Sequence, residues 1–318
     1  MNTPINSHRM KNISLPYRRF DVKLDLASSE SVSSFLGATL RGGFGYVLKK
    51  TVCAAGRQSC ERCILRNQCA YAWLFETFPH ADAVRLRKYK HVPHPFAMRP
   101  AQNGSRMLIE LVLIGDAIRF LPYFIYTFDK LGATGLGKRR VRFSVQEAVA
   151  DDQTVVYSAR SPDAIAENAA PRTLTIKPGR KRLGTVTLNF ISPVVIRRES
   201  KPLDRFDPVP FVTTLLRRVT NLNAFFGENK TIDIDPSPYI KAAESLACDS
   251  SMRPLPLRRF STRQQQRIDY TGLVGTATLK GDVGTLTPLL KAGEILGVGK
   301  NTVFGFGRYV TSNNVSSL

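Results

Sequence analysis

Alternating apolar and polar side chains, together with apolar residues at helical spacing, predict a regular series of elements in the first half of the chain. The segment 17–26 (YRRFDVKLDL) alternates and indicates a strand. Segment 35–50 carries its large apolar residues near helical spacing, and segment 107–114 is apolar enough for a buried strand. A second helix is predicted at 119–130, and alternation resumes at 141–145. The predicted order is therefore strand, helix, strand, helix, strand.

The second half of the chain repeats this order. Segment 182–197 alternates again, and segment 211–226 has apolar residues at i, i+4 and i+8, with Arg217 and Arg218 on another face, as in an amphipathic helix. A strand is predicted at 268–279 and a short helix from Leu289. The apolar residues of 303–310 then predict a final strand.

Both halves contain the same unit, in which a helix is followed by a glycine-rich loop with a lysine and then by a strand. The unit occupies residues 123–145 and again 289–309, a separation that leaves room for a small domain in each copy. The pattern predicts an α+β fold of tandem ferredoxin-like (RRM-like) βαββαβ domains. We expect an N-terminal domain over residues 12–176, which carries an insertion with four cysteines, and a C-terminal domain over residues 182–318.

Glycine is unusually frequent in the first predicted helix. Gly37, Gly42, Gly43 and Gly45 each cost roughly 1 kcal/mol relative to alanine inside a helix. We therefore expect something to approach this helix closely, either another element of the fold or an RNA backbone. Arg41, on the same helix, is a candidate RNA contact.

Charge and hydrophobicity narrow the class of partner. The chain has 318 residues, of which 43% are hydrophobic, and a formal net charge of +21. Such a charge predicts a polyanionic partner, either a nucleic acid or an anionic membrane surface. The sequence shows neither an apolar run of about 18 residues nor a secretory leader. We therefore expect a cytoplasmic protein that binds a nucleic acid and no membrane.

Four cysteines lie within seventeen residues, at Cys53, Cys60, Cys63 and Cys69. The pair Cys60 and Cys63 has the two-residue spacing that lets two thiolates face one ion, and reduced cytoplasmic thiols make disulfides unfavourable. Four thiolates suit tetrahedral zinc, which we expect as a structural cofactor that holds the insertion in place. An iron–sulfur cluster with the same ligands and four free thiols are the alternatives.

Cations and glycines mark the candidate RNA-binding residues. Glycine lets a backbone approach a phosphate closely, and lysine and arginine neutralise it. A donor-rich run, RPLPLRRFSTRQQQR, suits phosphates, 2′-hydroxyls and base edges, with a solvated hairpin as the alternative. The residues that we expect to contact RNA are Gly297, Gly299, Lys300, Asn301, Gly305, Gly307, Arg258, Arg259, Arg263, Lys138, Arg139, Arg140 and Arg41.

Three of the four histidines, His80, His91 and His94, lie within fifteen residues in a basic segment that is rich in proline. A structural role or a phosphate contact is an available interpretation for each. Histidine is also the side chain that exchanges a proton near neutral pH. Any acid–base chemistry is therefore expected to use this segment.

A family resemblance is carried by two C-terminal stretches, RRFSTRQQQRIDYTGLVGTATLKGD and LLKAGEILGVGKNTVFGFGRY. They resemble the CRISPR-associated endoribonucleases of the RAMP superfamily that process precursor CRISPR RNA. The N-terminal stretches FLGATLRGGFGYVLKK and PHPFAMRP, with the cysteines ending in CAYAWLFE, resemble a cysteine-bearing branch of that family. The resemblance extends from about Arg18 to Tyr309.

The resemblance implies a substrate and a reaction. RNA would be held between the two domains and against the glycine-rich loop, with the precursor CRISPR RNA repeat stem-loop, the mature guide RNA and other subunits of a CRISPR effector complex as partners. Cleavage would need no catalytic cofactor, because the 2′-OH attacks the adjacent phosphorus and leaves a 2′,3′-cyclic phosphate and a 5′-OH. By resemblance, His80 is the first candidate for general base or acid and His91 the second. Tyr46 would assist, and Lys88 or Lys90 would stabilise charge.

Two other functions remain open at this stage. A non-catalytic RAMP subunit that coats guide RNA would keep both glycine-rich loops without needing His80. A nucleic-acid adaptor would instead use a zinc ion, bound by the four cysteines, to hold a surface that binds DNA or protein. Cleavage of repeat RNA separates the enzyme from both.

Overall fold

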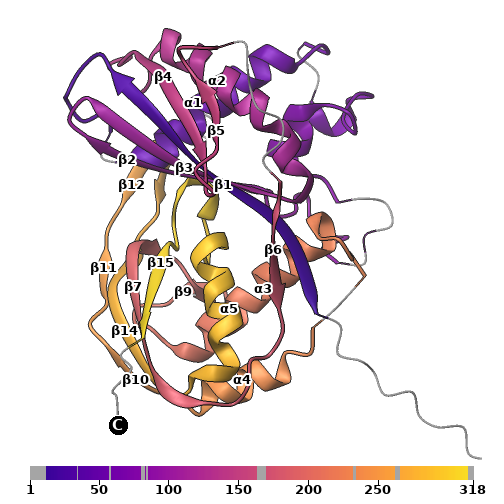
Figure 1. The fold of residues 1–318 in the computed structure, drawn as a ribbon, viewed down its shortest axis with the longest axis vertical. Helices are drawn as coiled ribbons and strands as arrows, with labels where there is room; N and C mark the ends of the chain where they lie inside the picture. The colour runs from indigo at the N-terminus through magenta and orange to yellow at the C-terminus, as the bar shows by residue number, and fades with distance from the viewer. Residues whose placement is uncertain are drawn as a thin grey trace, which may run out of the picture.

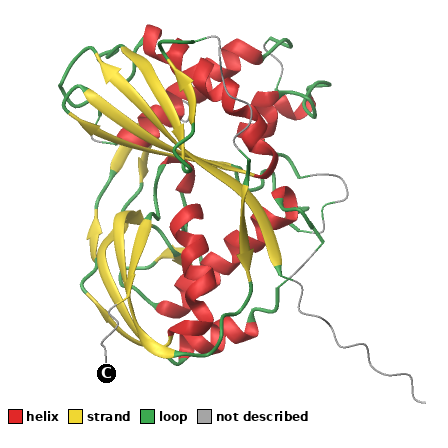
Figure 2. Ribbon diagram, in the orientation of Figure 1, coloured by secondary structure: helices red, strands yellow, loops and turns green. Residues whose placement is uncertain are grey.

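The computed structural model describes residues 12–33, 35–56, 59–79, 83, 85–162, 170–231, 234–261 and 266–313. Two α/β units lie end to end, each with a sheet and its helices (Figures 1 and 2). No helix in these residues is both long and apolar enough to cross a membrane.

The first unit is a ferredoxin-like sandwich. Its elements are β1 (Ile13–Leu26), α1 (Leu36–Val52), β2 (Phe96–Asn103), β3 (Arg106–Ile114), a 3₁₀ turn η3 (Gly115–Phe120), α2 (Leu121–Thr134) and β4 (Phe143–Ala150). The strands pair antiparallel in the order β2-β3-β1-β4, and β5 (Val155–Ser158) extends the sheet beyond β4. Strand β6 (Arg172–Ile176) pairs with the first residues of β1. The order of elements agrees with the segments predicted from the sequence, with one addition: β2 precedes β3 and was not among those segments.

The second unit repeats the arrangement. It contains β7 (Leu183–Val194), α3 (Pro208–Phe226), α4 (Ser237–Glu244), β10 (Ala247–Ser250), β11 (Arg253–Leu255), β14 (Gly272–Asp282), α5 (Val283–Leu296) and β15 (Tyr309–Asn313). The sheet order is β10-β14-β7-β15, which is the same as in the first unit, and β11 also pairs with β14. Two hairpins project from this unit: β8 (Arg197–Arg198) with β9 (Lys201–Pro202), and β12 (Arg258–Ser261) with β13 (Gln266–Asp269). The tandem ferredoxin-like prediction is confirmed.

Two predicted strands differ in detail. The strand expected at 268–279 is divided, because β13 belongs to the hairpin and β14 to the sheet. The strand expected at 303–310 begins only at Tyr309. The residues before it form a 3₁₀ turn, η4 (Thr302–Phe304), between Asn301 and Gly305, both of which have positive φ. Apolar composition suggested a strand here, whereas the left-handed positions require a turn.

The cores of the two units are continuous. Ile13, Leu15 and Val112 of the first unit are fully buried in the same cluster as Leu215 and Leu289 of the second. Strand β1, the indigo arrow in Figure 1, leaves the first sheet and runs beside the helices of the second unit. A long first strand therefore belongs to both hydrophobic cores.

Glycine allows the closest contact between the two units. A Cβ on Gly37 in α1 would lie 2.0 Å from the carbonyl oxygen of Phe304, in the turn η4. A Cβ on Gly115 would lie 2.2 Å from the carbonyl oxygen of Phe226 at the end of α3. For Gly37, what approaches the helix is thus another element of the fold.

Candidate nucleic-acid interface

The glycine-rich loop between α5 and β15 is a tightly hydrogen-bonded turn. The amide of Gly297 donates to Gly293 O at 2.8 Å, that of Gly305 to Thr302 O at 3.1 Å, and that of Gly307 to Pro193 O at 2.8 Å. The amide of Lys300 donates to Val195 O at 3.0 Å. These four N–H groups are used within the protein and are not available to a phosphate, whereas the side chain of Lys300 is exposed.

Two buried arginines hold the helix end that leads into this loop. Arg99, on β2, donates from Nη2 to Ile295 O at 2.5 Å and from Nη1 to Glu294 O at 3.4 Å. Arg218, on α3, donates from Nε to Leu296 O at 2.9 Å. The last carbonyls of a helix have no partners within the helix and carry partial negative charge, which cations stabilise. The two arginines therefore fix the position of the glycine-rich loop from opposite units.

Glu110 joins the two units through charge. Its carboxylate lies 2.5 Å from Arg99 Nη1 and 2.5 Å from Nη2 of Arg308, just before β15. Burial lowers the pKa of Arg99, while the negative charge of Glu110 opposes that shift. Removing Glu110 would leave both Arg99 and Arg308 without this carboxylate at the domain junction.

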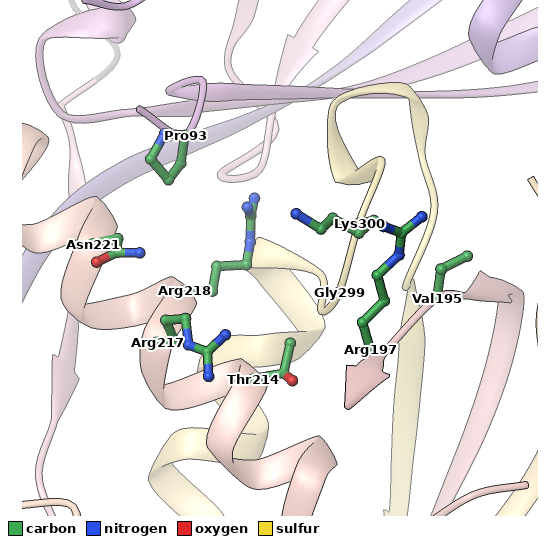
Figure 3. A pocket seen from close by; sticks show the side chains of 9 residues that line it. All are labelled: Pro93, Val195, Arg197, Thr214, Arg217, Arg218, Asn221, Gly299 and Lys300. Atoms are coloured by element: carbon green, nitrogen blue, oxygen red, sulfur yellow. The ribbon is translucent and has the colours of Figure 1, made fainter. Parts of the chain in front are cut away.

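A cationic pocket lies beside the glycine-rich loop (Figure 3). Its volume is about 190 Å³. The side chains come from α3, from the hairpin strand β8, from the glycine-rich loop and from Pro93 of the first unit. The lining residues are Pro93, Val195, Arg197, Thr214, Arg217, Arg218, Asn221, Gly299 and Lys300.

The electrostatics of the pocket are strongly positive. Arg197, Arg217, Arg218 and Lys300 contribute four cations, and none of the residues that line it is a carboxylate. Burial, followed by the charge of Arg99, lowers the pKa of Arg218 to about 9. The arrangement is suited to an anion.

Of the predicted RNA contacts, Gly299 and Lys300 line this pocket. Lys138, Arg139 and Arg140 are exposed on the turn between α2 and β4, where Arg139 pairs with Glu30, and they do not line it. Arg41 lies over the Phe75 ring at 5.1 Å. Arg258 and Arg259 are on strand β12, and Arg263 lies outside the described residues. The structure thus places the predicted contacts in several separate regions.

Sequence reasoning did not select the arginines of the pocket. Arg217 and Arg218 were visible only as the polar face of a predicted helix, and Arg197 only as the last residue of a predicted strand. Arg99 and Glu110 gave no signal, because Arg99 contacts Ile295, 196 positions away, and Glu110 contacts Arg308, in the other unit.

His80 lies outside the described residues, whereas His91 and His94 are described. The ring atom Nδ1 of His91 lies 2.5 Å from Glu76 O, and Nε2 lies 4.0 Å from the Glu76 carboxylate. Because a carbonyl only accepts, the neutral ring carries its proton on Nδ1 and leaves Nε2 able to take another. His91 is 38% exposed in its side chain. Its side chain is therefore accessible to a bound molecule.

His94 is of a different kind. It is largely enclosed, with Nδ1 3.2 Å from Thr77 Oγ1 and its ring against Phe75 and Phe96. Burial, followed by the positive charge of Arg41, lowers the pKa of His94 to about 3. At neutral pH it is an uncharged part of the core.

The other predicted catalytic residues surround the same segment. Lys90 pairs with Glu61 of the cysteine loop at 3.2 Å, and Lys88 is exposed. Tyr46 is 71% exposed on α1. Neither these three residues nor His91 line the cationic pocket.

The four cysteines are half-buried free thiols. Burial raises the pKa of Cys60, and the neighbouring Cys69 and Cys53 raise it further, so these three sulfurs are close enough to affect one another. The donor set therefore fits a thiolate-binding metal in its chemistry. In the described part of the chain, no three His, Cys, Asp or Glu side chains are positioned as a ready metal site.

Known proteins were compared with the chain. Residues 15–170 match a family model described as an N-terminal domain, and residues 188–309 match the model of the CRISPR-associated endoribonuclease Cas6. An uncharacterised protein of Archaeoglobus fulgidus is 28% identical over 287 residues, which cover 86% of this chain and 90% of that protein.

Several solved Cas6 structures share the fold of this chain. A product complex of Cas6 (TTHB231) has a TM-score of 0.55 at 16% identity and covers 93% of this chain and 100% of its own. Thermus thermophilus Cas6 (TTHB231) has a TM-score of 0.51 at 15% identity, with 95% and 99% coverage. A partial Cas6-RT-Cas1–Cas2 complex has a TM-score of 0.50 at 12% identity and covers 95% of this chain and 47% of that one.

The fold is that of a two-domain protein built from tandem ferredoxin-like units, as in the solved Cas6 structures. Residues 188–309, which form most of the second unit, match the family of the CRISPR-associated endoribonuclease Cas6, and this match confirms the resemblance recognised in the sequence. The cysteine-bearing branch remains a prediction.

Proposed function

We propose that this protein cleaves precursor CRISPR RNA within its repeats and keeps the mature guide RNA bound. The match of residues 188–309 to an endoribonuclease family carries this proposal. The net charge of +21 and the cationic pocket at the domain junction support a polyanionic substrate. Structures with this fold include complexes of Cas6 with a reaction product.

The proposed reaction is an internal transesterification. A base removes the proton of the upstream 2′-OH, O2′ forms a bond to the adjacent phosphorus, and the bond from phosphorus to O5′ breaks. An acid gives its proton to the departing O5′, so the products are a 2′,3′-cyclic phosphate and a 5′-OH. Because the nucleophile belongs to the substrate, two proton transfers and charge stabilisation suffice, and we propose that no metal takes part.

His91 has a geometry that supports a role in proton transfer. Its Nδ1 contact with Glu76 O leaves Nε2 as the proton acceptor, and the Glu76 carboxylate, 4.0 Å from Nε2, would stabilise the imidazolium. His80 is the other candidate for base or acid. Tyr46 is proposed as the helper, and Lys88 or Lys90 as the cation that stabilises the phosphorane.

Repeat RNA with EDTA tests the proposal directly. We expect cleavage at one site, products with a 2′,3′-cyclic phosphate, and no cleavage when a 2′-deoxynucleotide stands immediately upstream of that site. Cleavage of the deoxy substrate would show that water is the nucleophile and would reject the mechanism. Tight binding of unmodified repeat RNA without cleavage would instead identify a coat subunit for guide RNA, and stronger binding of duplex DNA would identify an adaptor.

Two further parts of the proposal concern partners and the cysteines. Other CRISPR effector subunits and a cytoplasmic location fit the proposed role in guide RNA maturation. Cys53, Cys60, Cys63 and Cys69 are proposed to hold a structural zinc ion, because four cysteines within seventeen residues, two of them at the two-residue spacing, supply a tetrahedral set of thiolate ligands. That ion would stabilise the insertion next to Lys90 and the histidine segment.

A further inference from the structure

We infer that the cationic pocket formed by Arg197, Arg217, Arg218 and Lys300 is a phosphate subsite, which holds one phosphate group of the RNA away from the reacting bond. The inference rests on the proposed function and assigns a role to residues that the proposed chemistry does not use.

The first argument is charge balance. Four cations share a pocket of about 190 Å³ with no carboxylate among the residues that line it. Elsewhere at the same junction, the structure pairs its cations with a carboxylate: the buried Arg99 and the half-buried Arg308 both contact Glu110. Like charges at close range raise the free energy of the folded state unless an anion is present. The pocket therefore lacks the partner that the neighbouring arginines have.

The second argument is the orientation of Arg218. Its Nε is fixed by the carbonyl of Leu296 at 2.9 Å, so the guanidinium has one orientation. Its Nη2 is buried and has no hydrogen-bond partner in the described part of the chain. Figure 3 shows this guanidinium facing the ammonium of Lys300 across the pocket. A phosphate oxygen between them would satisfy the donor, in the planar geometry that guanidinium groups offer to phosphate.

The third argument is the size and polarity of the pocket. Its volume of about 190 Å³ leaves room for a phosphodiester group together with water. Thr214 and Asn221 add neutral hydrogen-bonding groups, and Pro93 and Val195 add apolar walls. A small pocket of this kind selects a phosphate group and not a base-paired stem.

The fourth argument concerns the proposed catalytic residues that the structure describes. His91, Tyr46, Lys88 and Lys90 do not line the pocket. A phosphate bound there is therefore held for position and affinity. Because Arg218 also holds the end of α5, the bound phosphate would be in contact with the residue that anchors the glycine-rich loop.

The test measures binding of cleaved repeat RNA as salt is raised, so that it does not depend on catalysis. Arg217→Ala and Lys300→Ala change exposed side chains of the pocket, and Lys241→Ala removes an exposed cation of α4 outside it. Each lost phosphate contact lowers the slope of log affinity against log salt by about 0.7 to 0.9. We expect that loss in both pocket variants, together with roughly tenfold weaker binding at low salt, and the wild-type slope in Lys241→Ala. Unchanged slopes in both pocket variants would overturn the inference.

Two RNA ligands identify which phosphate is bound. One product RNA ends in a 3′-phosphate and the other in a 3′-OH. If the wild type prefers the phosphorylated end and the pocket variants lose that preference, the pocket holds the terminal phosphate. If the slope of log affinity against log salt falls equally for both RNAs in the variants, the pocket holds an internal phosphodiester. Either result supports the subsite.

The inference and the proposed function can fail separately. A wild-type protein that binds but does not cleave, with reduced slopes in the pocket variants, would reject the nuclease and keep the subsite. A protein that cleaves repeat RNA, with unchanged slopes in the variants, would keep the nuclease and reject the subsite. Circular dichroism and thermal melting of each variant check that it is folded.

Discussion

Arg99 and Arg218 come from different ferredoxin-like units and bind neighbouring carbonyls at one helix end. Arg99 reaches Ile295 O at 2.5 Å, and Arg218 reaches Leu296 O at 2.9 Å. The two contacts set where α5 ends and where the glycine-rich loop begins. Because one arginine comes from each side, the loop keeps its place only while the two units remain docked.

The first prediction concerns Arg99. Replacing it with methionine removes three hydrogen bonds from a charged donor and leaves Glu110 paired with Arg308 alone. We expect the free energy of unfolding to fall by about 2–3 kcal/mol, since hydrogen bonds to charged groups contribute at that level. Urea denaturation measures the change. The control is Arg106→Ala, an exposed residue on the adjacent strand; equal stability of the two variants would contradict the prediction.

The second prediction concerns the close contact of α1. Gly37→Ala places a Cβ 2.0 Å from the backbone oxygen of Phe304, which cannot move without the loop. We expect a loss of stability of about 1–3 kcal/mol from the forced shift.

Gly43→Ala in the same helix is the matched control, because its Cβ would meet only the side-chain ends of Leu131 and Leu136, at 3.1 and 3.2 Å. That variant should be close to wild type or slightly more stable, since alanine favours a helix by up to about 1 kcal/mol. Thermal melting of both proteins decides the matter. If the Gly37 variant were as stable as the Gly43 variant, the contact between α1 and the turn at Phe304 would not be a tight one, and the prediction would be wrong.

The third prediction concerns pH. The pKa of His94 is lowered to about 3 in the folded protein, against about 6.5 in an unfolded chain. Between these values the unfolded state binds the extra proton, so stability falls as pH falls through this window. The groups that lower this pKa by their charge are Arg41, His91 and Arg218, after burial itself. Going from pH 7 to pH 5 should cost up to about 2 kcal/mol from this residue.

Unfolding curves at the two pH values test this dependence, and His94→Gln is the variant for comparison. The variant should be less stable at pH 7 and lose less stability on acidification. An identical pH dependence in both proteins would show that His94 is not the group responsible.

The fourth prediction concerns the histidines of the proposed reaction. Loss of a general acid or base lowers the rate by about 10²–10⁴. We expect such a fall in single-turnover cleavage of repeat RNA for either His80→Ala or His91→Ala, with little change in RNA affinity. His94→Gln should retain cleavage, because its ring is neutral and enclosed. Wild-type rates in both alanine variants would discard the assignment.

The fifth prediction concerns the cysteines. The wild type should contain one zinc ion per chain by elemental analysis, and Cys60→Ser should lose it. Proteolysis within residues 53–69 should become faster in that variant, since the metal is proposed to hold the insertion in place. Cys248→Ser, which changes an exposed thiol outside the cluster, is the control. Iron with acid-labile sulfide would identify a cluster instead, and stoichiometric zinc in Cys60→Ser would exclude this set of ligands.

The sequence predicted what depends on local pattern. Alternation over 17–26 and apolar spacing over 211–226 identified β1 and α3, and the repeated unit identified the tandem fold. The sequence could not distinguish two roles for Gly305 and Gly307, because a turn with positive φ and a close phosphate contact both favour glycine. In the structure both residues have positive φ and form part of a turn that packs against the protein itself. The contact of Arg218 with Leu296 joins residues 78 positions apart and has no local signal.

The extent of β1 has a practical consequence. Ile13 and Leu15 are fully buried among side chains of α3 and α5, although their strand also forms the centre of the first sheet. A fragment that starts at β7 would therefore expose the apolar side chains of α3 and α5 that β1 covers. A fragment that stops at β6 would expose the apolar side chains of Ile13 and Leu15. Attempts to express either half alone should yield insoluble material, and heat should melt the intact protein in a single transition.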